Sequence, residues 1–200
     1  MRALSKGDVA TLGTTVAATV AATADGRKLV VRAGVTADAR AVRDLIDAVA
    51  AEPDMPLLAT PGSIGLRDVK VMIGRGARDP RSLFLVAEVA GVVAGDLGGS
   101  GLPFAPSAHV FEFGMSVGAQ YRGLGVGSAL LERTIAWAAA AGFTKVILSA
   151  FPHNTRAIAF YERHGFTLEG RRALQFCRAG RYFDELLMGR PVGSPVHPGA

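Results

Sequence analysis

The chain has 200 residues, half of them hydrophobic and a fifth charged, with a formal net charge of +5 and a single cysteine, Cys177. This length and composition predict one globular domain with a core of ordinary size, and a single cysteine excludes an internal disulfide and a multi-cysteine zinc site. The basic balance favours anionic ligands, but the arginines are scattered, with no basic run and no aromatic–basic interleaving, which argues against nucleic acid as the main ligand.

The first 27 residues are rich in Ala, Thr, Val and Gly. Ala22-Thr23-Ala24 resembles the small-residue cleavage site of a signal peptide. Glycine and threonine residues interrupt the apolar part, so we favour a flexible N-terminal extension over residues 1–27. No apolar stretch approaches the roughly 20 residues that cross a bilayer. We therefore expect a cytoplasmic protein with no membrane partner, a folded domain over 28–191 and a tail over 192–200.

The folded domain begins with a strand and a helix. Residues 29–35 are rich in valine and predict the first strand. Thr36 or Asp38 then caps a helix, in which apolar residues follow the i, i+3, i+4, i+7 spacing of a core-facing stripe. This helix is expected to end before Pro53. Residues 55–75 predict a loop with at most a helical turn or two.

Strand signals dominate the middle of the chain. Ala90-Gly91 is a two-residue hairpin connection, because its glycine can supply a positive φ. A helix connects the strand at 110–117 to the strand at 145–150, so these two should be parallel. The pattern therefore predicts a mixed α/β sheet. The expected elements are strands at 82–89, 92–98, 109–117 and 145–150, a helix ending at Gly142, a helix from Asn154 to Gly165, and a hairpin over 166–190.

Three glycines at alternate positions, Gly123, Gly125 and Gly127, occupy the turn between the strand at 110–117 and the next helix. Glycine allows a positive φ and leaves the backbone N–H groups open to a ligand. With the free donors of the first helical turn, these amides form a site for a phosphate or pyrophosphate. The spacing differs from the dinucleotide fingerprint, and no lysine is present for a P-loop.

The same turn, with Gln120, Gly123 and Gly125, matches the acyl-CoA signature Gln/Arg-x-x-Gly-x-Gly/Ala. A second run at 154–166 reads Asn-Thr-Arg-Ala-Ile-Ala-Phe-Tyr-Glu-Arg-His-Gly-Phe. On these two motifs the chain resembles the GNAT superfamily of acetyl-CoA-dependent N-acetyltransferases over roughly 29–190. The resemblance implies the GNAT fold, α/β (α+β), with a mixed central sheet of six to seven strands, flanking helices and a splay between the two parallel central strands.

The resemblance also implies acetyl-CoA as co-substrate, no metal, a small-molecule amine as acceptor, and a homodimer as the assembly most common among relatives. The backbone of Met115, Ser116 and Val117 would meet the pantetheine arm like an added strand, and one N–H would polarise the thioester carbonyl. Gly114 would permit a bulge that opens the slot. Gln120 would shape the loop, and the pyrophosphate would be held by the amides of Arg122, Gly123, Leu124, Gly125, Val126, Gly127 and Ser128.

Side chains of the two motifs complete the implied site. Arg122 and Arg156 are candidates for the outer phosphates, because arginine presents a charged fork to phosphate oxygens. Asn154 is either a helix cap or a contact to the pantetheine. Tyr161 lies seven positions after Asn154, about 10 Å along the same helix face, and by resemblance its hydroxyl protonates the CoA thiolate.

Glu112 is the candidate base, at a position that matches a glutamate of some small-amine acetyltransferases of the superfamily. Phe111 and Phe113 flank it on a strand, so it points to the opposite face from those rings, and burial would suit it to accept a proton. An exposed strand glutamate is the alternative, and His109 or a water chain is another route for the proton.

The sequence thus predicts an enzyme that transfers acetyl from acetyl-CoA directly to a primary amine. The ending at 169–188 is similar to that of members that act on amino acids or polyamines. Alternatives are a protein N-terminal or lysine acetyltransferase and a catalytically silent CoA-binding sensor. No motif in the chain identifies the acceptor.

Overall fold

A computed structural model describes residues 16–53 and 57–193. Residues 1–15 of the expected N-terminal extension and residues 194–200 of the expected tail therefore lie outside the described residues. Within the described part, no helix has both the length and the apolar character that crossing a bilayer requires.

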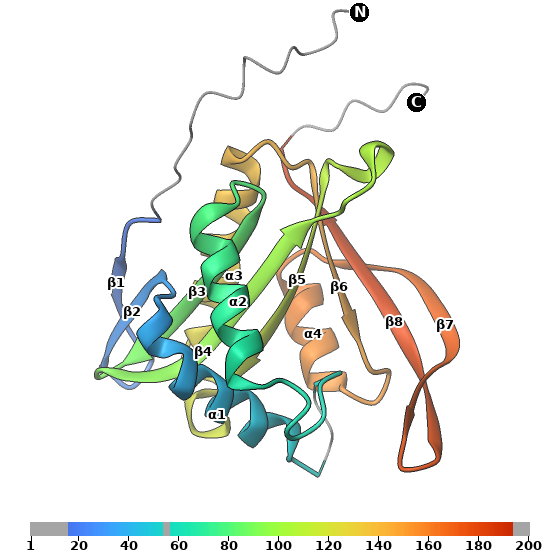
Figure 1. The fold of residues 1–200 in the computed structure, drawn as a ribbon, viewed down its shortest axis with the longest axis horizontal. Helices are drawn as coiled ribbons and strands as arrows, with labels where there is room; N and C mark the ends of the chain where they lie inside the picture. Colours follow the sequence, from blue (N-terminus) through green and yellow to red (C-terminus); the bar gives the residue numbers. More distant parts are fainter. Residues whose placement is uncertain (1–15, 54–56, 194–200) are drawn as a thin grey trace, which may run out of the picture.

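One eight-stranded sheet organises the domain, in the spatial order β1-β2-β3-β4-β5-β6-β8-β7, with helices on both faces (Figure 1). Among the strands of the described residues, only β5 and β6 are parallel neighbours, and the other neighbouring pairs are antiparallel. This confirms the mixed α/β sheet and the parallel central pair. The strands are β1 (Thr19–Ala22), β2 (Lys28–Ala33), β3 (Ser82–Val89), β4 (Val92–Gly101), β5 (Val110–Val117), β6 (Lys145–Ala150), β7 (Thr167–Arg178) and β8 (Arg181–Pro191).

Two helices cover each face of the sheet. On one face, α3 (Val126–Ala140) and α4 (Thr155–Arg163) close a core in which the rings of Phe111 and Trp137 lie 5.1 Å apart. On the other face, α1 (Ala39–Ala50) and α2 (Leu66–Arg78) pack Ile46 and Ile73 around Phe84. Each fully buried side chain of this size contributes roughly 1.5–3 kcal/mol through apolar burial.

Two elements differ from the sequence prediction. Strand β1 pairs with β2 inside the segment assigned to the extension, which brings the sheet to eight strands rather than six or seven. Helix α2 has 13 residues where a loop was expected. Glycines at 74 and 76 weaken its helical signal, yet a Cβ at Gly76 would lie 2.6 Å from the backbone nitrogen of Phe84. Close packing of α2 on β3 therefore requires glycine at position 76, and the same glycine made the helix hard to predict from the sequence.

The sheet opens between β5 and β6. Their pairing covers only three residue pairs and ends at Glu112 and Ile147, and beyond those residues the two strands diverge (Figure 1). The predicted splay is thus confirmed. The bulge expected at Gly114 is absent from the neighbouring ladder, because the β4–β5 register runs unbroken through the pair Gly98–Gly114.

Two sheet glycines make a matched pair for a stability test. A Cβ at Gly99 would lie 2.4 Å from the carbonyl oxygen of Glu112, whereas a Cβ at Gly114 would meet nothing within 4 Å. Because the β5 backbone cannot move aside, we expect Gly99→Ala to lower the free energy of unfolding by about 1–3 kcal/mol, and Gly114→Ala to change it little. Urea denaturation of both variants measures this, and equal midpoints would contradict the close approach.

Candidate active site

A single cavity of about 1110 Å³ occupies the opening in the sheet. It is larger than most pockets that hold a small ligand. Residues from both sequence motifs line it together with side chains from α1, α2, β4 and β8. Of the predicted site residues, the cavity is lined by Glu112, Met115, Ser116, Val117, Arg122, Gly123, Gly125, Gly127, Ser128, Asn154, Arg156 and Tyr161.

The glycine-rich turn ends at the N-terminus of α3. Gly123 and Gly125 have φ values of 74° and 89°, and Gly125 is the N-cap residue of the helix. A Cβ at either glycine would meet nothing within 4 Å, so the space beside them is open. The first amides of a helix have no intrahelical acceptor and carry the positive end of its dipole. The backbone N–H groups of the turn are therefore available as hydrogen-bond donors to an anionic ligand.

Three predicted residues of this turn point elsewhere. The Val126 side chain is buried in the core. The carbonyl of Leu124 accepts a hydrogen bond from the amide of Ala24, which ties the turn to the segment after β1. Gln120 is exposed and lines a smaller hollow beside α1. Any contact of Val126 and Leu124 with a ligand would run through the backbone, and the role of Gln120 in shaping the loop stays a prediction.

Arg122 braces the turn from within the protein. Its guanidinium forms two hydrogen bonds to Glu52, at 2.7 and 2.6 Å, and Nε donates to the carbonyl of Val117 at 3.0 Å. The side chain is 19% exposed. These contacts link the end of α1, the end of β5 and the turn, so Arg122 fixes their relative positions besides lining the cavity.

Ser128 is held from the opposite side. Its Oγ lies 3.1 Å from Nε2 of His164, whose Nδ1 lies 2.8 Å from the carbonyl oxygen of Phe160. This bridge joins the first turn of α3 to the end of α4. His164 thus has a structural role, and it keeps the two motif helices in register around the cavity.

Helix α4 directs several motif residues into the cavity. The side chain of Asn154 accepts a hydrogen bond from the amide of Ala157 at 3.1 Å, so it caps the helix. It also lines the cavity, and both roles left open by the sequence are compatible with this position. Arg156 and Arg163 are exposed and line the cavity as well, so two cations share it with the glycine-rich turn.

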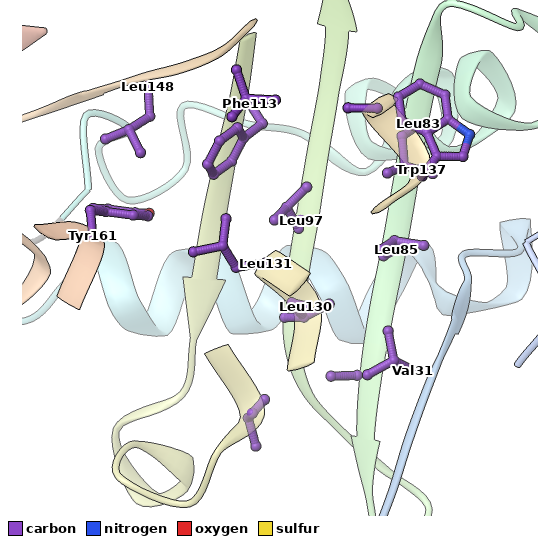
Figure 2. Packing of buried hydrophobic residues seen from close by; sticks show 14 of the residues in the cluster. Val31, Leu83, Leu85, Leu97, Phe113, Leu130, Leu131, Trp137, Leu148 and Tyr161 are labelled. Atoms are coloured by element: carbon purple, nitrogen blue, oxygen red, sulfur yellow. The ribbon is translucent and has the colours of Figure 1, made fainter. Parts of the chain in front are cut away.

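Tyr161, on α4, is 7% exposed and lines the cavity. Figure 2 shows its ring extending from α4 toward β5, where Phe113 lies. The ring centroids of this pair are 6.2 Å apart, and that of Phe166 lies 5.6 Å from Tyr161. Burial raises the pKa of Tyr161 well above its usual range. The hydroxyl is therefore a proton donor throughout the neutral range.

The end of β5 offers an open backbone edge. Within the described residues, Met115, Ser116 and Val117 pair with β4 but have no paired residue on β6. Such an edge can accept a ligand as an added strand. Glu112 lines the same cavity where β5 still contacts β6, and its side chain is exposed. Of the two interpretations that the sequence left open for Glu112, a buried base and an exposed strand glutamate, the structure has the exposed one, because alternation turns the side chain away from the aromatic core and into the open cavity.

Sequence reasoning missed four charged residues of the cavity: Arg75 on α2, Asp96 on β4, Arg163 on α4 and Glu185 on β8. Asp96 and Glu185 are both 5% exposed. Glu185 is paired with Arg172 at 2.9 Å. Burial raises the pKa of Asp96 to about 7, against the lowering effect of a hydrogen bond with Ser116. The only sequence signal was an acidic residue inside the otherwise apolar and glycine-rich strand at 92–101.

Known proteins match both the sequence and the fold. L-amino acid N-acetyltransferase AaaT of Escherichia coli (strain K12) is 32% identical over 87 residues, which are 42% of this chain and 52% of that protein. Mycothiol acetyltransferase of Beutenbergia cavernae is 35% identical over 107 residues, 53% of this chain and 35% of that protein. The chain thus matches about half or less of the length of these relatives.

A solved structure of yncA from Salmonella typhimurium, with its cofactor acetyl-CoA, superimposes with a TM-score of 0.75 at 21% identity, covering 86% of this chain and 98% of that one. This likeness shows a shared fold. The sequence profile of the acetyltransferase (GNAT) family matches residues 53–166, more than half of the chain, and includes both motifs. The chain therefore belongs to the GNAT acetyltransferase family.

Proposed function

We propose that this protein transfers the acetyl group of acetyl-CoA directly to a primary amine. The observation that carries the proposal is that one cavity joins three parts: the glycine-rich turn at the start of α3, the open edge of β5 and the hydroxyl-bearing Tyr161. Binding of a nucleotide thioester requires an anion site and a strand edge. Release of the thiol requires a proton donor. Similarity to family members named as N-acetyltransferases supports it.

The residues present fit acetyl-CoA, which would supply the acetyl group as a thioester. The amides from Gly123 to Ser128 would bind the pyrophosphate at the N-terminus of α3. The β5 edge from Met115 to Val117 would hold the pantetheine arm, and an N–H there would stabilise charge on the carbonyl oxygen. Asn154 would contact the arm from the start of α4. Tyr161 would give its proton to the departing sulfur.

Arg156 provides a test of the phosphate end. Its exposed guanidinium lines the cavity from the first turn of α4, and we expect Arg156→Gln to raise the Kd for acetyl-CoA about three- to tenfold, since an exposed ion pair contributes on the order of 1 kcal/mol. Arg67→Gln removes another exposed arginine, which lies on α2 outside the cavity, and should leave the Kd unchanged. Calorimetry at low and high salt measures both, and equal effects would remove Arg156 from the site.

The acceptor is proposed to be a small amine such as an amino acid or a polyamine. Similarity to an L-amino acid N-acetyltransferase supports this class, and the cavity has room for an acceptor beside the cofactor site. Acetylation of a protein N-terminus or lysine is the competing activity.

The deciding experiment measures release of free thiol from acetyl-CoA across amino acids, polyamines, aminoglycosides and short peptides. Acceptor-dependent release by the small amines is the expected result. Release only with peptides would overturn the small-acceptor assignment. Tight binding of acetyl-CoA with no release from any amine would overturn the transferase and favour a CoA sensor.

A further inference from the structure

The floor of the cavity is a strip of β4 and β5 in which glycine and serine residues leave space between two acidic side chains. Leu97, Phe111 and Phe113 belong to the core on the α3 face, so the residues that alternate with them face α1 and α2. Cross-strand pairing places the strip's members opposite one another, and all of them line the cavity. The strip consists of the pairs Asp96–Ser116, Gly98–Gly114 and Ser100–Glu112.

Each end of this strip carries one carboxyl group, and the two ends differ. Four residues along the strands separate the level of Asp96 from that of Glu112, which is about 13 Å at the rise of a strand. Asp96 is 5% exposed, whereas Glu112 is exposed. A single amino group cannot contact both carboxyl groups, so the two groups serve different positions.

Asp96 is also incompletely paired. Ser116 hydrogen-bonds its carboxyl group, but Oδ1 is buried and has no hydrogen-bond partner among the residues that the structure describes. Glu185, equally buried, is satisfied by Arg172. Burying a carboxylate without a partner costs several kcal/mol. Because Asp96 also lines the cavity, this unpartnered carboxyl group is a candidate site for a donor from outside the protein.

Part of the cavity wall is apolar and suits an alkyl group. Helix α1 contributes Ile46 and Val49 to the cavity lining, and the segment that leads into α2, with α2 itself, adds Leu57, Ile64 and Met72. A buried carboxylate within an apolar wall matches an alkylammonium ion, which has a charged head with three donors and a hydrocarbon body.

We propose that Asp96 is the subsite for the acceptor's amino group, binding it as an alkylammonium ion and taking one proton from it. The proposal rests on the proposed acetyl transfer and names the group that the acceptor meets. Ser116, its cross-strand partner, lies in the Met115–Val117 segment assigned to the thioester, one strand spacing of about 4.8 Å away. Glu112 lies about 13 Å further along β5. Asp96 is thus the carboxyl group nearer to the expected point of reaction.

The proton balance is complete with the residues of the cavity. The ammonium ion gives one proton to Asp96 and becomes the neutral amine, whose lone pair forms the new C–N bond to the acetyl carbon. The C–S bond breaks, and the sulfur takes the proton of Tyr161. The nitrogen then loses its second proton, which restores Tyr161, and Asp96 releases its proton to water. One acetyl group has moved and one proton has left.

The environment of Asp96 suits a proton acceptor at neutral pH. Burial raises its pKa to about 7, and the hydrogen bond with Ser116 keeps it from rising further. No charged group contributes to that shift. The charged residues that share the cavity from the surrounding elements are Glu112 on β5, Arg75 on α2, Arg122 in the turn, Arg156 and Arg163 on α4, and Glu185 on β8.

A binding experiment on the wild-type protein tests the subsite without turnover. Calorimetric titration with butylamine, which is a cation at both pH values used, should show at least tenfold tighter binding at pH 8 than at pH 5.5, because Asp96 is ionised only at the higher pH. Butan-1-ol, the uncharged analogue, should show no such dependence. Equal affinity for butylamine at both pH values, or no binding of butylamine at pH 8, would overturn the proposal.

Substitutions then test whether the pH-dependent binding of butylamine comes from Asp96. Asp96→Asn should weaken butylamine binding at pH 8 at least tenfold and remove its pH dependence, with the Kd for acetyl-CoA unchanged as proof of an intact fold. Asp44→Asn, on the exposed side of α1 and outside the cavity, should behave as wild type. If Asp96→Asn does not fold, Ser116→Ala keeps the carboxyl group, loosens its orientation and should weaken binding severalfold. Wild-type affinity in the folded variant would overturn the proposal.

Kinetics separates this inference from the proposed function. With an acceptor that is turned over, Asp96→Asn should lower kcat/KM for the amine at least tenfold and flatten the acidic limb of its pH profile, while Glu112→Gln should leave that limb in place. If the acidic limb of the kcat/KM profile disappears in Glu112→Gln and persists in Asp96→Asn, Glu112 is the group that accepts the proton of the amine. That result would overturn the proposal. Butylamine binding that depends on Asp96, with no thiol release from any amine, would refute the transferase and leave the ammonium subsite standing.

Discussion

Tyr161→Phe is expected to lower kcat about a hundredfold while leaving the Kd for acetyl-CoA nearly unchanged. General acid catalysis contributes roughly 10²–10⁴-fold, and the substitution removes only the hydroxyl group from a ring packed against Phe113 and Phe166. Burial raises the pKa of Tyr161, which keeps it protonated but also makes it a weaker acid. For that reason we expect the lower end of the range.

Steady-state rates at saturating acceptor and calorimetric titration with acetyl-CoA check this result. Tyr182→Phe is the matched control, because Tyr182 on β8 is 65% exposed and lies outside the cavity, so both parameters should keep their wild-type values. Turnover by Tyr161→Phe at the wild-type rate would remove Tyr161 from the acid role. A large rise in Kd with kcat unchanged would instead assign Tyr161 to cofactor binding.

The parts of the cavity that the sequence predicted are those encoded within one short segment. The turn at Gly123 and Gly125 and the helix that starts after Asn154 depend on local spacing, positive φ and capping. Such features are visible without knowing what lies across the sheet. They were enough to indicate the fold, because the helix that follows the glycine-rich turn connects β5 to β6 and makes the two strands parallel.

The parts that the sequence could not predict depend on contacts between distant segments. The pKa of Asp96 depends on its burial and on its cross-strand neighbour Ser116, and neither is encoded near position 96. Arg122 was expected at a phosphate, but its partner Glu52 lies 70 residues away at the end of α1. Glu112 alternates with buried phenylalanines as expected, and only the fold shows that the opposite face is an open cavity.

The pH dependence of stability should report the buried carboxyl group directly. Burial raises the pKa of Asp96 from 3.8 to about 7, so between these values the folded state binds a proton that the unfolded state has released. The free energy of unfolding should therefore fall as pH rises from about 4 to about 7 and level off above that. About three pKa units correspond to roughly 4 kcal/mol at 1.36 kcal/mol per unit. Asp96→Asn has no such proton and should escape this loss.

Urea denaturation of the wild type and Asp96→Asn at pH 5, 6, 7 and 8 measures the difference, which should grow in favour of the variant by a few kcal/mol across that range. Asp38, Asp79 and Asp184 have lowered pKa values, so they stabilise the fold above about pH 4 and lose that effect only in more acidic solution. Their contribution is common to both proteins and cancels. Asp44→Asn should follow the wild-type curve. A constant difference between wild type and Asp96→Asn would mean that Asp96 is ionised throughout, and hence that it already has a partner for its charge.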